Sequence, residues 1–256
     1  MSQSIIINSQ VDPCLRKQVA QHPYALLFAT ISGAHLYGFP SPDSDFDLRG
    51  IHCLPLQDLL GLQVTNETVE KAGIHDGLEI DLVTHDVRKF FKLLLNKNGY
   101  VLEQLLSPLI LHSTAWHQEL VTLAPGCITK HHAHHYLGFA QTQWHLLLKK
   151  PRVKALLYVL RVLLTGIHLM RTGQIQANVT ILNQNFKLGY IDELVHEKCT
   201  GREKIELPAQ RIPFFQSEYQ RLLSELENAH KTSPLPQQAT ATAAVNDLLL
   251  RIRLSQ

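Results

Sequence analysis

Cysteine is scarce in this sequence, and its spacing excludes two common uses of the residue. The 256-residue chain has four cysteines, which lie far apart and form no C-x-x-C pair: Cys14, Cys53, Cys127 and Cys199. A disulfide framework and a cysteine-based zinc site both require closely spaced cysteines. The sequence therefore predicts reduced thiols and a cytoplasmic location.

Targeting and membrane signals are also missing. Residues 1–8 lack a basic region followed by a long apolar stretch, and the apolar runs elsewhere are broken by Lys, Arg or His. Hydrophobic residues make up 45% of the chain and charged residues 18%, which is typical of a globular protein. We therefore expect a globular chain without an export or membrane signal.

Acidic residues are absent from one long stretch. No Asp or Glu occurs from Leu120 to Ile191, although the net charge of the whole chain is only +2. The basic residues of this stretch are Lys130, Lys149, Lys150, Arg152, Lys154, Arg161, Arg171 and Lys187. Such a stretch is typical either of a solvated helix surface or of a surface that binds polyanions.

An acidic pair follows a glycine-containing turn in the first half of the chain. The apolar run 25–31 precedes Gly33 and Gly38, and Asp45 and Asp47 come next. Residues i and i+2 of a strand point to the same face, so the two carboxylates would aim at one point. This pattern favours a Mg²⁺ site for phosphoryl or nucleotidyl transfer, although an ordinary acidic loop has the same sequence pattern.

A second acidic strand supplies a candidate third carboxylate. Residues 78–83 alternate in polarity and place Glu79 and Asp81 on one face. A two-metal site needs such a carboxylate from a neighbouring strand. We predict Asp45, Asp47 and Asp81 as catalytic residues and metal ligands, and we favour Asp81 over Glu79. The expected ion is Mg²⁺ or Mn²⁺, with an NTP as substrate.

The order of these motifs resembles a known superfamily. A glycine turn, an Asp-x-Asp strand and a later strand Asp resemble the DNA polymerase β-like nucleotidyltransferases, and segments 41–51, 79–94 and 98–108 resemble its RNA-ligase-associated (RlaP-type) members. The resemblance covers residues 30–110 and 130–175. It implies an α+β fold, in which a polymerase β-like core (a small mixed sheet with helices) precedes a helical C-terminal part. It also implies a role in RNA repair.

The resemblance further implies a phosphate-binding turn. The superfamily usually has a Ser just after the turn glycine, but this chain has Ala34 there, and Ser32 lies one step early. We predict Ser32, Gly33, Ala34 and Tyr37 in the NTP site, because glycine lets a backbone N–H approach a phosphate closely. Ala34 predicts a phosphate grip that is weaker or supplied by the backbone.

The predicted helix 153–171 carries a polar stripe among Leu and Val residues. The stripe comprises Lys154, Tyr158, Arg161, Thr165 and His168. It is either the exposed face of an amphipathic helix or a surface that binds substrate. In the second interpretation Lys154 and Arg161 grip the triphosphate or the acceptor backbone, and Tyr158 lies beneath a base. We predict Lys154, Tyr158 and Arg161 in the NTP site, with Arg161 as the first candidate.

Histidines cluster at the start of another predicted helix, 128–149, where His131, His134 and His135 would share a face. Such histidines can bind zinc, but no Glu accompanies them as in a zinc protease helix. We therefore favour a lining of a phosphate or RNA groove, or packing between helices, over metal binding.

Hydrophobic periodicity predicts a change of architecture along the chain. The predicted strands are 25–31, 45–53, 63–71 and 78–84. The predicted helices are 13–22, 86–97, 100–106, 115–123, 128–149, 153–171, 189–199, 214–230 and 239–254, with a short helix in the glycine turn. We predict two domains: residues 1–112 as the catalytic core and 113–256 as a helical domain that completes the NTP and acceptor cleft.

The main hypothesis is metal-dependent transfer of an NMP from an NTP to an acceptor hydroxyl. An RNA or tRNA end is the expected acceptor, bound by the basic residues of 120–191. One alternative is AMP transfer to a small molecule or a protein. Another is an inactive NTP- or RNA-binding module, which Ala34 motivates. A third is a partner in a toxin or repair complex whose C-terminal helices mediate assembly. The sequence predicts neither the preferred NTP nor the oligomeric state.

Overall fold

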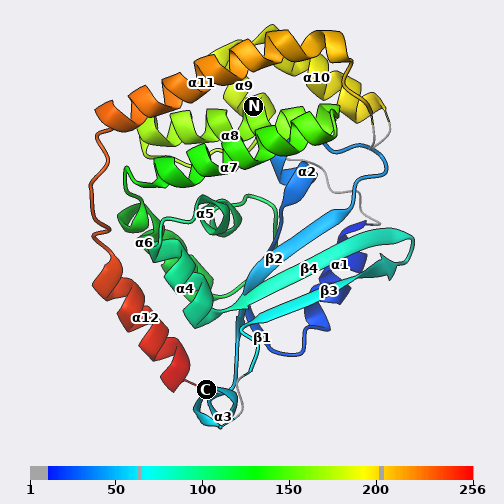
Figure 1. Cartoon of the computed structure of the whole chain (residues 1–256). Coiled ribbons are helices and arrows are strands. Elements are labelled where there is room, and N and C mark those ends of the chain that lie inside the picture. The colour runs from blue at the N-terminus through cyan, green and yellow to red at the C-terminus, as the bar shows by residue number, and fades with distance from the viewer. Residues whose placement is uncertain (1–10, 63–64, 202–204, 256) are drawn as a thin grey trace.

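A mixed sheet and a set of helices make up the computed structural model, which describes residues 11–62, 65–201 and 205–255 (Figure 1). The strands are β1 (Ala25–Ile31), β2 (Phe46–Cys53), β3 (Thr68–His75), β4 (Leu78–Asp86) and β5 (Ile110–Ser113). The helices are α1 (Val11–Ala20), α2 (Gly33–Tyr37), α3 (Leu56–Leu60), α4 (Val87–Leu95), α5 (Gly99–Leu105), α6 (Ala115–Leu123), α7 (His132–Lys149), α8 (Val153–Thr172), α9 (Val179–Phe186), α10 (Gly189–Thr200), α11 (Ile212–Thr232) and α12 (Thr242–Leu254). This arrangement confirms the predicted α+β class, with a small mixed sheet followed by a largely helical part.

The strand order of the sheet is β3-β4-β2-β1-β5. Strands β2 and β4 run parallel, and the other neighbouring pairs run antiparallel. A tight hairpin joins β3 to β4, and its two turn residues Asp76 and Gly77 have φ values of 51° and 80°. Two positive φ values are typical of a type I′ turn, whose twist matches that of the flanking strands. The parallel register then sets Asp47 of β2 directly opposite Asp81 of β4.

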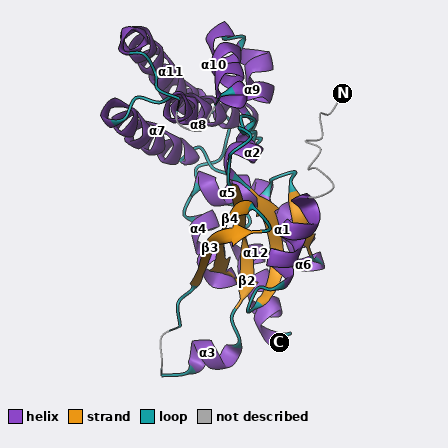
Figure 2. Ribbon diagram, turned by 90° about the vertical axis from the view of Figure 1, so that its right-hand side faces the viewer, coloured by secondary structure: helices purple, strands orange, loops and turns teal. Residues whose placement is uncertain are grey.

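Helices cover the sheet on both faces (Figure 2). Helix α4 contacts β2 and β4, and α5 contacts β1 and β2, so both lie over the centre of the sheet. Helix α1 contacts β5, at one edge of the sheet. Asp86 begins α4, since its side chain accepts a hydrogen bond from the Arg88 N–H at 2.9 Å. Asn98 caps α5 in the same way through the N–H of Tyr100.

The helical part is built around α8, which is apolar on nearly all sides. It contacts α7, α9, α10 and α11, and its Leu, Val and Ile side chains are buried. A helix that is hydrophobic all round is a core helix when neighbours surround it. Among the described residues α8 is the one helix long and apolar enough to cross a membrane, but 78% of its most apolar window is buried inside the protein.

The last helix returns to the sheet. Helix α12 contacts α4 and α6, so the C-terminal segment packs beside the N-terminal half (Figure 1). Arg253 of α12 donates to the buried Asp86 carboxylate at 2.6 Å and to the Leu54 carbonyl at 2.9 Å. The division between residues 112 and 113 stays a prediction. Any such division must take into account that α12 packs against α4 of the first part.

The element predictions differ from the structure at identifiable places. Strand 25–31 is confirmed. The predicted strand 63–71 is wrong in its bounds, because the Asp76-Gly77 turn extends β3 to His75 and the strand begins at Thr68; residues 63–64 lie outside the described chain. The short elements β5, α3 and α9 were not predicted.

Candidate active site

The glycine turn and the first metal-ligand candidate are in direct contact. The Ser32 N–H donates to the Asp47 carbonyl oxygen at 2.7 Å, which joins the end of β1 to β2. Gly33 has φ +60°, and a Cβ added there would lie 1.8 Å from the Asp47 Oδ2 atom. Only glycine therefore fits beside this carboxylate. Gly33 and Gly38 both have positive φ, at 60° and 88°.

Two of the predicted carboxylates converge on one cation. The Arg49 Nη2 atom donates to Asp47 Oδ1 at 2.5 Å and to Asp81 Oδ2 at 2.9 Å. The Asp81 side chain is 38% exposed and that of Asp47 is 19% exposed. Carboxylates from two parallel strands thus meet at a solvent-accessible point, where they already bind the positively charged Arg49 guanidinium. The exposed Glu79 has no corresponding contact with Arg49 among the described residues.

Electrostatics links Asp45 to this pair. Burial raises the pKa of the Asp47 carboxyl, the Arg49 guanidinium lowers it, and the charges of Asp45 and Asp81 raise it. Asp45 lies immediately before β2 and acts on Asp47 through charge in this way. Two further negative charges that raise the pKa of Asp47 complete a set of carboxylates that a dication would stabilise.

Oxygen donors of this kind fit a hard divalent cation. Mg²⁺ and Mn²⁺ prefer carboxylate oxygens together with water and phosphate. The turn adds one further polar atom, because the Ser32 Oγ is buried and has no hydrogen-bond partner in the described part of the chain. A buried hydroxyl without a hydrogen-bond partner is unfavourable, and a phosphate oxygen could accept its hydrogen bond. The residues present therefore fit both the metal and the phosphate.

Lys154 and Tyr158 lie on the side of α8 that faces the carboxylates. The Lys154 charge lowers the pKa of Asp47, and burial together with the Asp47 charge raises the pKa of Tyr158. Tyr158 also meets Tyr37 edge-on, with ring centroids 5.5 Å apart. The structure thus brings Lys154 and Tyr158 close to the predicted metal ligands.

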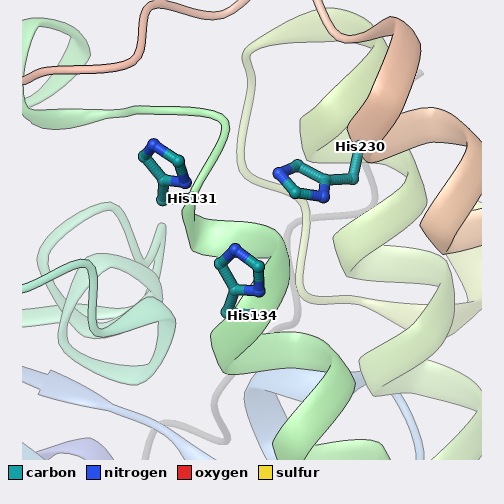
Figure 3. A group of neighbouring side chains, drawn as sticks. All are labelled: His131, His134 and His230. Carbon is teal, nitrogen blue, oxygen red and sulfur yellow. The ribbon is translucent and has the colours of Figure 1, made fainter.

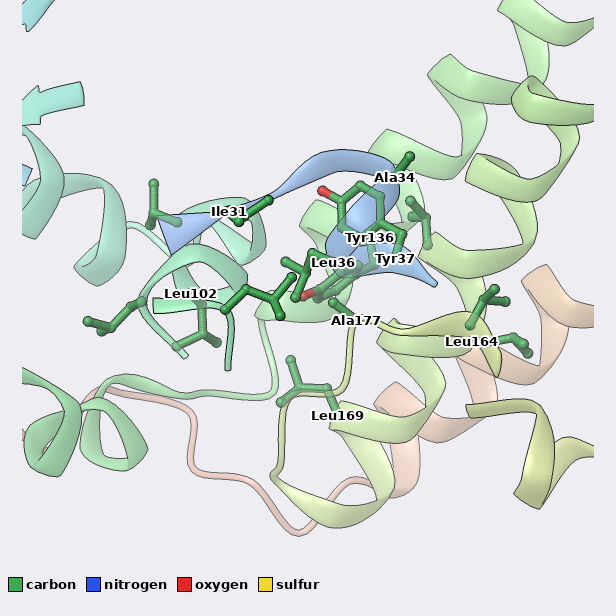
Figure 4. Close-up of a cluster of buried hydrophobic side chains, with 14 of the residues drawn as sticks. Ile31, Ala34, Leu36, Tyr37, Leu102, Tyr136, Leu164, Leu169 and Ala177 are labelled. Carbon is green, nitrogen blue, oxygen red and sulfur yellow. The ribbon is translucent and has the colours of Figure 1, made fainter. Parts of the chain in front are cut away.

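Arg161 and Tyr37 lie deeper than the sequence suggested. Arg161 is fully buried, and its Nη1 donates to Glu103 Oε2 at 2.7 Å. Its guanidinium also lies over the Tyr37 ring at 3.9 Å, within the cluster that holds Tyr37 and Tyr136 (Figure 4). An arginine enclosed in this way does not reach a phosphate in this conformation. The polar stripe on α8 faces the core here because Glu103 of α5 pairs with it, so a phosphate contact for Arg161 stays a prediction that this geometry does not support.

Two residues of the site were not predicted. Arg49 joins the carboxylates, and its Nε donates to the Tyr100 hydroxyl at 3.1 Å. The signal for Arg49 was present, since it follows Asp47 by two strand positions and so shares its face. No such signal exists for Tyr100, which reaches the site through the packing of α5 on β2.

Comparison with known proteins finds relatives in archaea and bacteria. The chain is 34% identical over 155 residues to the uncharacterized protein MJ0002 of Methanocaldococcus jannaschii, which covers 59% of this chain and 63% of that protein. It is 28% identical over 143 residues to the uncharacterized protein YcgL of Bacillus subtilis, which covers 54% of each. The matches thus span less than two thirds of either relative.

Among solved structures, a nucleotidyltransferase-like protein from Exiguobacterium sibiricum 255-15 superposes with a TM-score of 0.35 and 12% identity, covering 96% of this chain and 80% of that one. At this score the two structures differ too much for individual residues to be compared. The family comparison covers far more: the pattern of RlaP, described as an RNA repair pathway DNA polymerase beta family, matches residues 7–251. This range contains the glycine turn, all three carboxylates and the helical part. The chain therefore belongs to the RlaP family of polymerase β-type nucleotidyltransferases linked to RNA repair.

Proposed function

We propose that this protein transfers an NMP from an NTP to an acceptor hydroxyl, with Mg²⁺ or Mn²⁺ as cofactor. The observation that carries the proposal is the convergence of Asp47 and Asp81 on the Arg49 Nη2 atom, at 2.5 and 2.9 Å, beside the Gly33 turn. The partly exposed carboxylates, the tight turn and the unpartnered Ser32 hydroxyl together match the needs of a metal-bound triphosphate.

Asp45, Asp47 and Asp81 would hold the metal. When bound, the ion supplies Lewis-acid stabilisation of the charge that develops on the phosphates. The acceptor oxygen attacks the α-phosphorus, its proton passes to Asp81, and the bond from the α-phosphorus to the bridging oxygen breaks to release pyrophosphate. Asp81 suits the proton-accepting role because it is the more exposed of the two carboxylates on Arg49.

The NTP phosphates would lie against the turn formed by Ser32, Gly33 and Ala34. Ala34 is buried and has no hydroxyl, so the backbone and the Ser32 Oγ are the expected contacts. The charge of Lys154 lowers the pKa of Asp47. We therefore assign Lys154, and not Arg161, to the triphosphate.

We propose an RNA end as the acceptor. Lys149 and Lys150 are exposed at the end of α7, and Lys154 follows in the first turns of α8. We propose that these cations form a short basic path for RNA, because Lys154 already acts by its charge on Asp47. Not all of the basic stretch is available, since Arg161 pairs with Glu103 and Arg171 pairs with Glu225 at 2.8 Å. Phosphate contacts made by this path predict binding that weakens steeply with salt.

The test is incubation of the protein with Mg²⁺, each labelled NTP in turn and total cellular RNA, followed by a denaturing gel and a pyrophosphate assay. We expect label on a discrete RNA with wild-type protein and with Glu79→Gln, and none with Asp81→Asn or Asp47→Asn. Glu79→Gln is the matched control, because it removes an exposed carboxylate two residues from Asp81 on the same strand.

Other outcomes would replace the proposal with a specific alternative. Label on protein or on a small molecule would favour AMP transfer to that acceptor. Mg²⁺-dependent NTP binding without pyrophosphate release would favour the inactive binding module, for which Ala34 is the motivating residue. Turnover that survives in Asp47→Asn with the fold intact would refute the assignment of the site.

A further inference from the structure

Three histidines from two helices far apart in the sequence meet at one point. His131 immediately precedes α7, His134 lies in its first turn, and His230 lies in the last turn of α11. One ligand nitrogen from each lies within 4.8 Å of the others, and Figure 3 shows the three rings facing a common space. The sequence placed His131 and His134 on one helix face, but it gave no sign that His230 joins them.

The imidazoles are available as ligands. No hydrogen bond ties any of the three rings to another group in the described part of the chain. The His131 and His134 rings are parallel, with centroids 5.7 Å apart, and His230 stands edge-on to His134 at 4.8 Å.

The backbone holds this arrangement together without any ion. After α11 the chain passes back over the start of α7, where the Lys130 N–H donates to the Pro236 carbonyl at 3.0 Å. The Thr240 N–H then donates to the Gly126 carbonyl at 2.8 Å. These bonds fix the end of α11 beside residues 126–130 and therefore preorganise the three histidines.

We propose that His131, His134 and His230 form a site for a divalent transition metal of the Zn²⁺ class. Three imidazole nitrogens select such ions over Mg²⁺, which prefers oxygen. Three protein ligands leave one of four tetrahedral positions open, as in zinc sites that bind a water or another ligand.

The surroundings indicate the nature of the fourth ligand. The charges of Lys97 and Lys130 act on His131, and that of Lys231 acts on His230. An open pocket of about 500 Å³ adjoins the cluster and is lined by His131, His134, His135, Lys97, Asn96, Asn98 and Leu93. Cations around a dication are unfavourable unless an anion joins it. We therefore expect an anionic fourth ligand, such as phosphate or hydroxide.

This site is separate in chemistry from the carboxylates of the proposed transferase. One set offers nitrogen and the other oxygen, so the two sites should load independently. The experiment titrates tag-free protein with Zn²⁺ by calorimetry, in saturating Mg²⁺ so that the carboxylates are occupied. We expect one Zn²⁺ per chain at this site, unchanged in Asp47→Asn. Affinity should fall at least about tenfold in His134→Ala and His230→Ala, as expected for loss of a ligand.

The matched control is His145→Ala. His145 is exposed on the same helix α7, and its ring contacts the Gln141 carbonyl instead of the cluster. It should bind Zn²⁺ as the wild type does. Two readouts do not depend on activity: Zn²⁺ should raise the Tm of the wild type and of His145→Ala but not of His230→Ala, and Co²⁺ should give the visible absorption of a tetrahedral complex in the first two proteins only.

Three results would overturn the proposal. The first is absence of Zn²⁺ binding to the wild type. The second is binding that His230→Ala leaves unchanged while its metal-free Tm and circular dichroism show an intact fold. The third is binding that Asp47→Asn abolishes, which would assign the ion to the carboxylates.

Discussion

Two arginines in this molecule each bind carboxylates, but in opposite surroundings. Arg49 joins Asp47 and Asp81 at the edge of the proposed active site, where the Asp81 side chain is 38% exposed. Arg161 of α8 joins Glu103 of α5 between these two helices, where both side chains are almost fully buried. Solvent reaches the first cluster, whereas protein encloses the second.

The difference in exposure assigns different roles to the two clusters: the Arg49 cluster belongs to the candidate site, and the Arg161 pair stabilises the fold. A partly exposed carboxylate cluster can take up a metal ion from solvent. A buried ion pair cannot, because removing one partner leaves the other charge uncompensated. The sequence pattern singled out Arg161 and passed over Arg49. In the structure Arg49 contacts two of the predicted metal ligands, whereas Arg161 is fully enclosed.

The largest expected effect is on turnover. Asp81→Asn should lower nucleotidyl transfer at least about a thousandfold, because in the proposed mechanism this carboxylate binds metal and accepts the proton. Its free energy of unfolding should change little, since Asp81 is more than a third exposed. Initial rates and urea unfolding measure the two quantities. A thousandfold loss that accompanies unfolding would instead make Asp81 a structural residue.

The buried pair should show the opposite behaviour. Arg161→Met should cost about 3–5 kcal/mol of stability, because Glu103 remains buried without its partner. Arg171→Met is the control, since the Arg171 pair with Glu225 is exposed and should contribute about 0–1 kcal/mol. Urea unfolding of both variants tests the difference. Equal losses in the two variants would contradict the scaffold role of Arg161.

The glycine turn allows a finer test. Gly33→Ala and Gly77→Ala both place a side chain at positive φ, which costs about 1–2 kcal/mol. Only Gly33→Ala also brings a Cβ against the Asp47 carboxylate, since nothing lies within 4 Å of the Cβ position at Gly77. Gly33→Ala should therefore lose more stability than Gly77→Ala, and only Gly33→Ala should lose transferase activity. Full activity in Gly33→Ala would mean that the turn does not position Asp47.

The smallest expected effect is a dependence of stability on pH. Burial lowers the pKa of His52 from 6.5 to about 4, so the unfolded chain takes up a proton below pH 6.5 before the folded chain does. The contribution of His52 to stability is therefore fully present above pH 6.5 and is lost as the pH drops towards 4, by roughly 1 kcal/mol between pH 7.5 and 6.

The check compares His52→Asn with His145→Asn, which changes an exposed histidine. Urea midpoints at pH 7.5 and 6 should differ less in His52→Asn than in the wild type, and as much as the wild type in His145→Asn. If the difference between the two urea midpoints is the same in His52→Asn as in the wild type, His52 does not titrate as described.

Local patterns sufficed for much of the fold and for part of the site. The alternating polarity around Asp81 predicts a strand, and the glycines before Asp45 and Asp47 predict a turn. In the structure Asp47 and Asp81 both bind Arg49, and the charge of Asp45 acts on Asp47. Strand β5 has only four residues and forms by pairing with β1, which no local pattern encodes. Such elements depend on contacts made after the chain has folded.

Residues that meet across long sequence separations were beyond reach for the same reason. Glu103 lies on α5 and neutralises Arg161 of α8, and His230 of α11 joins the histidines at the start of α7. A periodic pattern gives the face of a helix on which a side chain lies. It does not give the element that this face will meet.

The most direct test of the comparison is Mn²⁺ binding, measured by electron paramagnetic resonance of the free ion in the presence of a non-hydrolysable NTP. Asp47→Asn should lose Mn²⁺ binding, and Glu103→Gln, which alters the buried pair, should keep it despite a lower stability. Equal binding by both variants, or loss in Glu103→Gln alone while it remains folded, would contradict the assignment of the metal site to the exposed carboxylate cluster.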